Sequence, residues 1–193
     1  MDKHYLQPLL EPEVIVVFAA RQGDPAQQTA QGRALTEAIR AQRFTGTIRF
    51  LDIGFTGTLA ERSQTRADLA VIALPPGDIA AALEVAGRMT CRAALIVSNG
   101  VAADEAAALR QIAQREGVLL LGPNSLGFQR PRLKLNASAA GPLARAGSLG
   151  LVCQSGALTA AMLDWARSNG VGFSLVASVG PHTDVDIAPV LDF

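Results

Sequence analysis

The chain has 193 residues, of which 49% are hydrophobic and 5% aromatic, and its 17 basic and 17 acidic residues give a formal net charge of zero. A neutral chain lacks the basic surface that nucleic acids and anionic membranes attract, so we expect partners of neither kind. Cys91 and Cys153 are too far apart in sequence for a metal-binding spacing or a disulfide framework. The N-terminus has no signal-peptide stretch, and no apolar run approaches the ~20 residues of a membrane helix, which predicts a cytoplasmic protein.

Short apolar segments alternate with helix-forming segments over the first two thirds of the chain. The predicted strands cover residues 14–18, 47–53, 68–74, 93–98 and 118–122. The predicted helices cover residues 24–43, 77–89 and 102–117, with Asp24 and Asp78 as N-caps and Gly117 as a glycine stop. Strands joined by long helical crossovers form parallel sheets, and strands that are apolar throughout have helices on both faces. The sequence therefore predicts an α/β fold with a Rossmann-like, doubly wound parallel sheet.

The strand–helix pattern restarts after residues 136–150, which are rich in alanine, glycine and serine. We interpret these residues as a connection between two domains. A second unit follows, with strands at 149–153 and 173–179 and a helix at 157–170. A unit of about 45 residues is short for an independent domain, so we expect a fragment of a longer protein. Because residues 173–179 would form an exposed apolar edge strand, we predict a homo-oligomer, a dimer or larger.

Special residues follow each predicted strand of the first sheet at its carboxyl end, where ligands of open parallel sheets bind. Among these residues, Ser98, Asn99, Asn124 and Ser125 offer hydrogen bonds, and the neighbouring glycines and prolines let the backbone approach a ligand. The turns are "AARQGD", "DIGF", "LPPG", "SNG" and "GPNSLG". Ordinary strand–helix loops commonly contain the same residue types, so a ligand-binding rim and plain turns both remain open.

The sequence "CQSGAL" marks a second candidate site, where a strand ends and a helix begins at Ala157. Free backbone N–H groups at a helix start attract anions, so Ser155 caps the helix, holds a phosphate, or does both. A nucleophilic role is disfavoured because Gln-Ser-Gly is not the Gly-x-Ser-x-Gly elbow.

Other notable side chains have structural explanations. His182 fits a solvent-facing loop better than a catalytic base. Asp184, Asp186 and Asp192 fit a helix start better than a metal cluster. Trp165 stands at helical spacing from Met162 and fits a core position. We therefore predict no catalytic residue and no metal ligand in this chain.

Taken in order, these segments resemble the NDP-forming acyl-CoA synthetase superfamily from about residue 9 to the end. The superfamily includes the α subunit of succinyl-CoA synthetase, ADP-forming acetyl-CoA synthetases and the synthetase-like region of bacterial protein lysine acetyltransferases. The most specific feature is "GPNSLG" followed by "QSGAL" at this distance. Further matching stretches are "LLEPEVIVVFAA", "DLAVIALPP", "LNASAAG", "LDWARSNGVGFS" and "SVGPHTDVDIAPVLDF".

The resemblance implies a CoA-binding Rossmann-like domain over residues 9–136, a linker over 137–147 and the truncated start of a flavodoxin-like ligase domain over 148–193. The full enzyme would form acyl-CoA through an acyl phosphate and a phosphohistidine, or would be a protein lysine acetyltransferase. This chain would bind CoA or acyl-CoA and would require downstream ligase and ATP-grasp domains or a further subunit. No residue matches the phosphorylated histidine, so we expect the chain alone to be inactive.

The resemblance also implies binding residues. The first turn would hold the CoA phosphates, the three following turns would border the adenine or line the pantetheine path, and the helix start would lie beside the phosphohistidine and bind its phosphate. These residues are, in that order, Arg21, Gln22 and Gly23; Pro75 and Pro76; Ser98, Asn99 and Gly100; Pro123 and Asn124; and Ser155 and Gly156.

Two departures from the family bear on CoA binding. Phe18 stands where the family has a glycine, and its ring is large enough to occlude the phosphate pocket. Asp52 ends the second strand, where an acid repels a 3′-phosphate and suits a ribose hydroxyl. Two alternatives therefore stay open: a degenerate, non-catalytic regulatory or assembly domain with an occluded CoA site, and NAD(H) binding through Asp52. The second is weaker because "FAARQGD" lacks the full glycine pattern.

Overall fold

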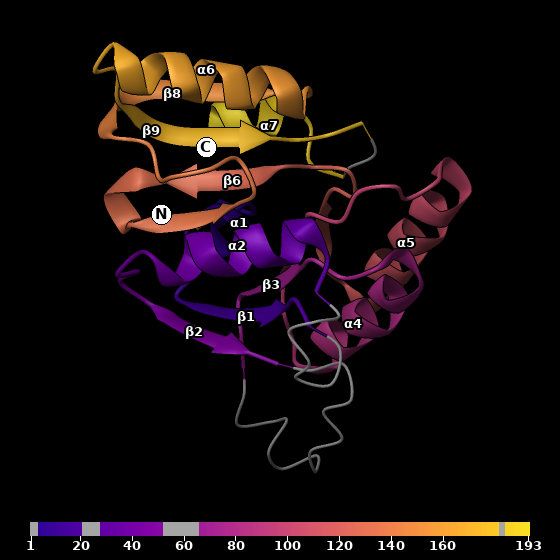
Figure 1. Ribbon diagram of the computed structural model, residues 1–193. Helices are drawn as coiled ribbons and strands as arrows, with labels where there is room; N and C mark the ends of the chain where they lie inside the picture. The colour runs from indigo at the N-terminus through magenta and orange to yellow at the C-terminus, as the bar shows by residue number, and fades with distance from the viewer. Residues whose placement is uncertain (1–3, 21–27, 52–65, 182–183) are drawn as a thin grey trace.

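The structure is a computed structural model, and it describes residues 4–20, 28–51, 66–181 and 184–193 (Figure 1). The elements are α1 (Gln7–Leu10), β1 (Val14–Phe18), α2 (Ala30–Arg40), β2 (Thr47–Phe50), β3 (Leu69–Ile72), α4 (Pro76–Arg88), β4 (Ala93–Ile96), α5 (Ala103–Glu116), β5 (Leu119–Leu121), β6 (Gly127–Arg130), the 3₁₀ helix η2 (Pro131–Leu133), β7 (Leu135–Ser138), β8 (Ala146–Cys153), α6 (Gly156–Ser168), β9 (Phe173–Ser178) and α7 (Ile187–Asp192).

The first five strands form one parallel sheet in the order β2-β1-β3-β4-β5. The buried sides of α4 and α5 pack against one face of this five-stranded sheet, and α1 and α2 pack against the other (Figure 1). This confirms the doubly wound α/β fold. The strand order reverses direction between β1 and β3, and such a switch point is where ligands of open α/β sheets bind.

A second sheet contains four strands in the order β7-β6-β9-β8. In this four-stranded sheet β6 is antiparallel to both β7 and β9, whereas β8 and β9 are parallel and are joined by α6. Leu163 and Ala166 of α6 cover one face, and Phe128 and Leu175 on the opposite face belong to the apolar core that also contains Leu35 of α2. The two sheets therefore share one core, with α2 between them (Figure 1).

One expectation about the second half of the chain was wrong. The strand β9 is not an edge strand, because it lies between β6 and β8. The partner strand β6 has only four residues, which begin at Gly127 and are followed by Pro131. Its sequence contains no recognisable strand pattern. The segment 136–150 that we expected to connect two domains contains the end of β7 at Ser138 and the start of β8 at Ala146, so residues 139–145 form the connection between these strands. The domain limits 9–136, 137–147 and 148–193 stay a prediction.

The helix ends agree only partly with the expected caps. Gly117 ends α5 with a left-handed φ of 68°, as predicted. Asp78 does not cap α4; it lies in the first turn, after an N-cap at Pro75. Trp165 is 56% exposed rather than in the core. Asp24 and His182 lie outside the described residues. Among the residues that the structure describes, no helix is long and apolar enough to cross a membrane.

Candidate functional site

Three neighbouring strands of the five-stranded sheet end in turns that the sequence marked as candidate binding residues. Because β3, β4 and β5 are parallel neighbours, their carboxyl ends meet at one edge. We call residues 75–76, 98–100 and 123–124 at this edge the carboxyl rim. The predicted residues Arg21, Gln22 and Gly23, and also Asp52, lie outside the described residues.

Ser98 fastens the end of β4 to the end of β3. Its hydroxyl donates a hydrogen bond to the Leu74 carbonyl at 2.6 Å and accepts one from the Leu74 N–H at 3.0 Å. The side chain is buried, and both of these hydrogen bonds join it to the backbone of Leu74. The next residues, Asn99 and Gly100, are exposed and can meet a ligand. Ser98 thus fixes where Asn99 stands relative to the Pro75 turn.

Asn124 fastens the end of β5 to the loop that leads into α5. Its N–H donates to the Ser98 carbonyl at 3.0 Å, and its side-chain Nδ2 donates to the Val101 carbonyl at 2.9 Å. Its Oδ1 accepts from the Val101 N–H at 3.4 Å. The side chain therefore pairs with Val101 much as a neighbouring strand would. Pro123, just before it, is buried.

Ser125 connects the carboxyl rim to the four-stranded sheet. Its buried hydroxyl donates to the Ser178 carbonyl at the end of β9 and accepts from the Gly127 N–H at 2.9 Å. The polar side chains of "GPNSLG" thus bond within the protein: Asn124 bonds along the carboxyl rim, and Ser125 bonds across to the four-stranded sheet. The turn is structural in this respect, and the accessible groups of the rim are Asn99, Gly100 and the Pro75–Pro76 turn.

The second candidate site lies at the start of α6, beside the same turn. Ser155 is exposed and caps the helix, because its Oγ accepts from the Leu158 N–H at 3.2 Å. Gly156 follows as the first helical residue, and a Cβ there would stand 2.8 Å from Cγ of Leu126. The structure therefore places the predicted phosphate-binding residues Ser155 and Gly156 next to the connection that leaves the carboxyl rim.

The start of α2 lies over the switch point between β1 and β3. Thr29 caps this helix by accepting from the Gly32 N–H at 2.9 Å, and its hydroxyl also lies 3.4 Å from the Ala73 carbonyl. A Cβ on Gly32 would stand 2.9 Å from the Ala73 oxygen and 3.1 Å from the Ala19 oxygen, so only glycine permits this approach. Sequence reasoning missed Thr29 and Gly32, although a hydroxyl three residues before a glycine in the first crossover was a usable signal.

Four long helices of the described residues begin near the carboxyl ends of strands, and they differ in the charge of their first turns. The first turns of α4 and α5 contain acids, namely Asp78, Asp104 and Glu105. The first turns of α2 and α6 contain none, and each begins with a hydroxyl N-cap. Because the N-terminal end of a helix carries partial positive charge, α2 and α6 are the two helix starts best suited to an anion.

Phe18 does not project from the end of β1. Its ring is fully buried and packs in the layer between the five-stranded sheet and α4, together with Ile72, Leu74 and Ile79. The idea of an occluded phosphate pocket therefore receives no support from the position of this ring.

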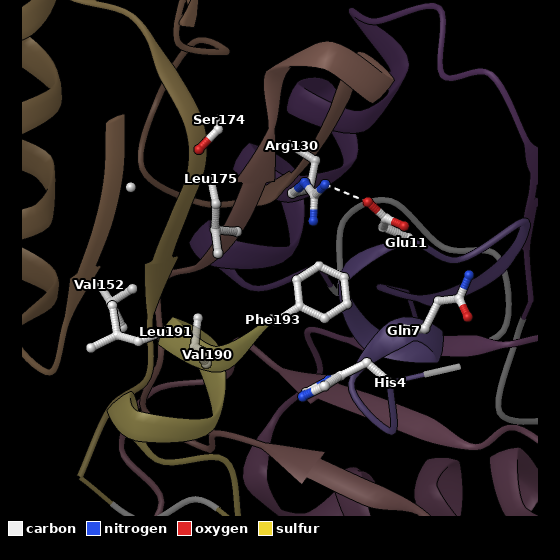
Figure 2. A pocket seen from close by; sticks show the side chains of 11 residues that line it. His4, Gln7, Glu11, Arg130, Val152, Ser174, Leu175, Val190, Leu191 and Phe193 are labelled. Atoms are coloured by element: carbon white, nitrogen blue, oxygen red, sulfur yellow. Dashed lines mark hydrogen bonds and ion pairs between the residues drawn. The ribbon is translucent and has the colours of Figure 1, made fainter. Parts of the chain in front are cut away.

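A cavity of about 610 Å³ lies on the other side of the molecule, between α1, α7 and the four-stranded sheet (Figure 2). Its charged groups pair with one another: Arg130 donates to Glu11 at 2.5 Å, and the Arg130 guanidinium lies 5.4 Å from the centre of the Phe193 ring. His4 Nε2 lies 3.4 Å from Asp192 Oδ2. None of the predicted binding residues lines this cavity.

Two buried or partly buried groups that are not residues of the carboxyl rim have raised pKa values. Burial, with a smaller effect of Asp68, raises the pKa of the Cys91 thiol to about 12. Burial also raises the pKa of Asp184, and the nearby Arg110 offsets this only in part. No group of three His, Cys, Asp or Glu residues in the described ranges has the arrangement of a metal site. The described part of the rim is therefore suited to binding rather than to proton transfer.

Comparisons with known proteins show that the chain is similar to CoA ligases. A family model described as "Succinyl-CoA ligase like flavodoxin domain" matches residues 146–193. The chain is 29% identical over 201 residues to the ADP-forming acetate–CoA ligase I of Archaeoglobus fulgidus, covering 97% of this chain and 28% of that protein. It is 34% identical over 132 residues to the α subunit of the ADP-forming acetate–CoA ligase I of Pyrococcus furiosus, covering 65% of this chain and 29% of that one.

A solved structure has the same fold. The "dinucleotide forming Acetyl-coenzyme A synthetase 1" of Ca. Korarchaeum cryptofilum, in its apo form, superimposes with a TM-score of 0.84 at 23% sequence identity. The match covers 97% of this chain and 43% of that chain. The chain thus spans less than a third of the length of the two curated relatives and less than half of the solved one.

Proposed function

We propose, from the now confirmed resemblance to the NDP-forming acyl-CoA synthetase superfamily, that this chain is the CoA-binding portion of an ADP-forming acyl-CoA synthetase. The observation that carries the proposal is the carboxyl rim. It gathers exposed turns from β3 and β4 beside the acid-free start of α2, at the switch point of the sheet. An extended, phosphorylated molecule needs this combination of main-chain donors and a long open edge.

In this proposal the phosphates of CoA bind where β1 ends and α2 begins. The acid-free first turn at Thr29 favours anions there. Arg21, Gln22 and Gly23, which precede this helix in sequence, would supply further donors. When bound, CoA supplies the thiol that accepts the acyl group.

The pantetheine arm would then follow the rim from the Pro75–Pro76 turn past Asn99 and Gly100. Asn99 and Gly100 are exposed, whereas the buried Ser98 and Pro123 would act by positioning the turn rather than by contact. Asn124 holds the far end of this path through Val101. The start of α6 at Ser155 would bind the phosphate that a histidine of the full enzyme carries.

The remaining steps of acyl-CoA formation belong to parts outside this chain. Acyl phosphate formation would require an ATP-grasp domain or a separate subunit, and the α-subunit relative from Pyrococcus furiosus favours an assembly of this kind. The named relatives are ligases, which favours a ligase over a protein lysine acetyltransferase as the parent protein. From the same resemblance we propose a CoA-binding domain over residues 9–136, a linker over 137–147 and the start of a ligase domain over 148–193.

Isothermal titration of the chain with CoA tests the proposal. We expect saturable binding, and we expect Asn99→Ala to weaken it roughly fivefold, since one lost hydrogen bond is worth about 1 kcal/mol. Asn169→Ala is the matched control, because Asn169 is exposed at the far end of α6 and should leave the affinity unchanged. Absence of heat at high micromolar CoA would refute the proposal.

Two further ligands separate the alternatives. If Asp52 repels the 3′-phosphate, dephospho-CoA should bind at least as tightly as CoA. Binding of NADH but not of CoA, measured by nicotinamide fluorescence, would instead indicate that the carboxyl rim binds a dinucleotide.

A further inference from the structure

A second cavity, of about 460 Å³, lies beside the C-terminal half of α6. One wall is formed by α6, with Leu163 and Ala166, and by the turn that follows this helix. The opposite wall is formed by residues 142–145 of the connection between β7 and β8, and Phe173 at the start of β9 lies between the two walls. Ligand pockets of proteins measure about 300–1,000 Å³, so this cavity is large enough for a small organic molecule.

The walls of this cavity do not depend on the last residues of the chain. All the residues that line it lie between 142 and 173, and none belongs to β8 or α7. The helix α7 packs on the opposite face of the four-stranded sheet, because Val190 shares a core with Leu175, whereas Leu163 of α6 shares a different core with Phe173. The chain therefore ends on the other face of the sheet from the cavity.

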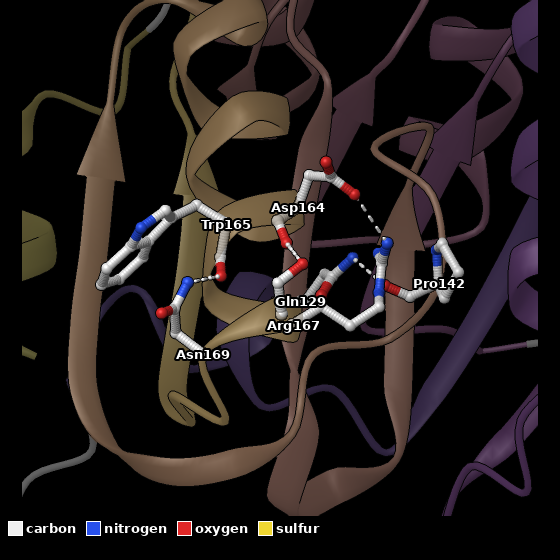
Figure 3. Close-up of polar contacts among 7 residues, drawn as sticks. Gln129, Pro142, Asp164, Trp165, Arg167 and Asn169 are labelled. Atoms are coloured by element: carbon white, nitrogen blue, oxygen red, sulfur yellow. Dashed lines mark hydrogen bonds and ion pairs between the residues drawn. The ribbon is translucent and has the colours of Figure 1, made fainter.

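Buried polar side chains fasten the wall that the connection forms. Gln129 is fully buried; its Nε2 donates to the Pro142 carbonyl at 3.3 Å, and its Oε1 accepts from the Ala144 N–H at 2.9 Å (Figure 3). Asn136 Nδ2 donates to the Gly141 carbonyl at 2.9 Å. Buried amides are costly unless they are paired, so these hydrogen bonds favour one conformation of the connection. The wall is therefore formed before any ligand binds, as in most ligand pockets.

The interior of the cavity is apolar. Leu163, Ala166 and Phe173 are each less than 5% exposed, and together with Val176 they form a small core cluster that the cavity reaches. Val171 is partly buried and packs against the same cluster. An apolar molecule in the cavity would extend this cluster and remove more apolar surface from water.

Two arginines stand on opposite walls, and each extends toward the other wall. Arg145 belongs to the connection, and its Nη1 donates to the Gly170 carbonyl, just after α6, at 3.3 Å. Arg167 belongs to α6, and its Nη2 would stand 4.0 Å from a Cβ on Gly141 of the connection. Figure 3 shows the Arg167 guanidinium beside Pro142. No acidic residue lines the cavity.

The charges at the cavity favour an anion. Arg167 Nη1 pairs with Asp164 Oδ1 at 3.1 Å, but the two side chains are 51% and 82% exposed, and such an exposed ion pair is weak. A guanidinium has five N–H donors, so Arg167 can bind a second carboxylate while it keeps Asp164. Together with Arg145, these three groups leave one net positive charge at the cavity.

We propose that this cavity binds a small carboxylate with an apolar body, of the class of medium-chain fatty acids. The apolar body would lie against Leu163, Val171 and Phe173. The carboxylate would pair with Arg145 and Arg167, which would join the two walls through the ligand.

This site is separate from the carboxyl rim and from the start of α6. The helix α6 has 13 residues, and at 1.5 Å per residue its C-terminal end stands about 20 Å from the cap at Ser155. A carboxylate in the cavity therefore cannot reach a group that binds at Ser155. The proposal does not depend on CoA binding, and either can fail without the other.

Titration of the chain with octanoate, followed by calorimetry, tests the proposal. We expect saturable binding with a Kd below about 1 mM. Octanol has the same chain without the charge, and acetate has the charge without the chain, so both should bind at least fivefold more weakly. Backbone amide NMR shifts caused by octanoate should concentrate in residues 142–145 and 167–173, and CoA should not displace the ligand.

Matched substitutions locate the carboxylate. Arg145→Gln and Arg167→Gln should each weaken octanoate binding at least fivefold, because each removes a charge-assisted hydrogen bond. Arg88→Gln is the control, since Arg88 is exposed in the last turn of α4 as Arg167 is in the last turn of α6. Its affinity should be unchanged. The proposal is overturned by no saturable binding up to about 5 mM, by equal binding of octanol, by displacement with CoA, or by an affinity that neither cavity substitution changes.

Discussion

Replacing Ser98 with alanine tests whether side-chain hydrogen bonds hold the carboxyl rim. The hydroxyl donates to the Leu74 carbonyl at 2.6 Å and accepts from the Leu74 N–H at 3.0 Å, and Ser98 is only 2% exposed. Alanine removes the Oγ atom and little else. The change therefore leaves both backbone groups of Leu74 without this partner, in a place that water barely reaches.

The expected loss follows from these two hydrogen bonds. A neutral hydrogen bond contributes about 0.5–1.5 kcal/mol net, and a buried backbone group left unpaired costs about 1–3 kcal/mol. We therefore expect Ser98→Ala to lower the free energy of unfolding by about 2–4 kcal/mol. Urea unfolding followed by circular dichroism at 222 nm measures it, with a shift in the midpoint and an unchanged slope.

Ser148→Ala is the control for this experiment. Ser148 is exposed on β8, and its substitution should change the free energy of unfolding by less than about 0.5 kcal/mol. A loss below about 1 kcal/mol for Ser98→Ala would refute the reasoning, since the rim would then be held by backbone pairing alone.

Three further predictions concern other positions. Gly122 has a φ of 89°, and a Cβ there would stand 2.2 Å from the Ile96 oxygen, so Gly122→Ala should cost more than about 2 kcal/mol in urea unfolding; a cost under about 1 kcal/mol would contradict this. Burial raises the pKa of Cys91 to about 12, so a thiol reagent at pH 8 should modify only Cys153 in the native chain and both thiols after unfolding; two fast thiols would be inconsistent with the structure. Burial raises the pKa of Asp184 above its usual 3.8, so the native state holds this proton more tightly than the unfolded chain, and the resulting stability is present below that pH and lost as pH rises through the native pKa. Asp184→Asn cannot ionise, and its unfolding free energy relative to the unsubstituted chain should increase between about pH 3 and pH 7; a decrease would reverse the assigned sign.

The doubly wound sheet was predictable because each strand carries its own signal. Strands such as β3 and β4 are buried throughout, and a buried parallel strand reads as a continuous apolar run. The helices between them forced parallel crossovers. The sequence also marked "GPNSLG" and "QSGAL" as unusual, and the structure places both at the junction of the two sheets.

The partners of these residues were not predictable from the sequence. Asn124 and Ser125 bond to Val101 and Ser178, which lie 23 and 53 residues away, and no local pattern indicates these partners. The position of β9 inside its sheet depends on β6, a four-residue segment with no strand signal of its own. Similarly, Trp165 stands at helical spacing, but only the packing of α6 decides which side of that helix is covered.

By itself, the sequence determined most local conformations, the parallel α/β class and the resemblance to acyl-CoA synthetases, because apolar runs, caps and turn residues act over a few neighbours. Only the tertiary structure decided which polar groups hydrogen-bond within the protein, which strands lie at the edges of the sheets and which apolar side chains of α6 face solvent. These features depend on contacts between residues far apart in the chain. The identity of a hydrogen-bonding side chain does not indicate whether it will pair with the protein backbone or with a ligand.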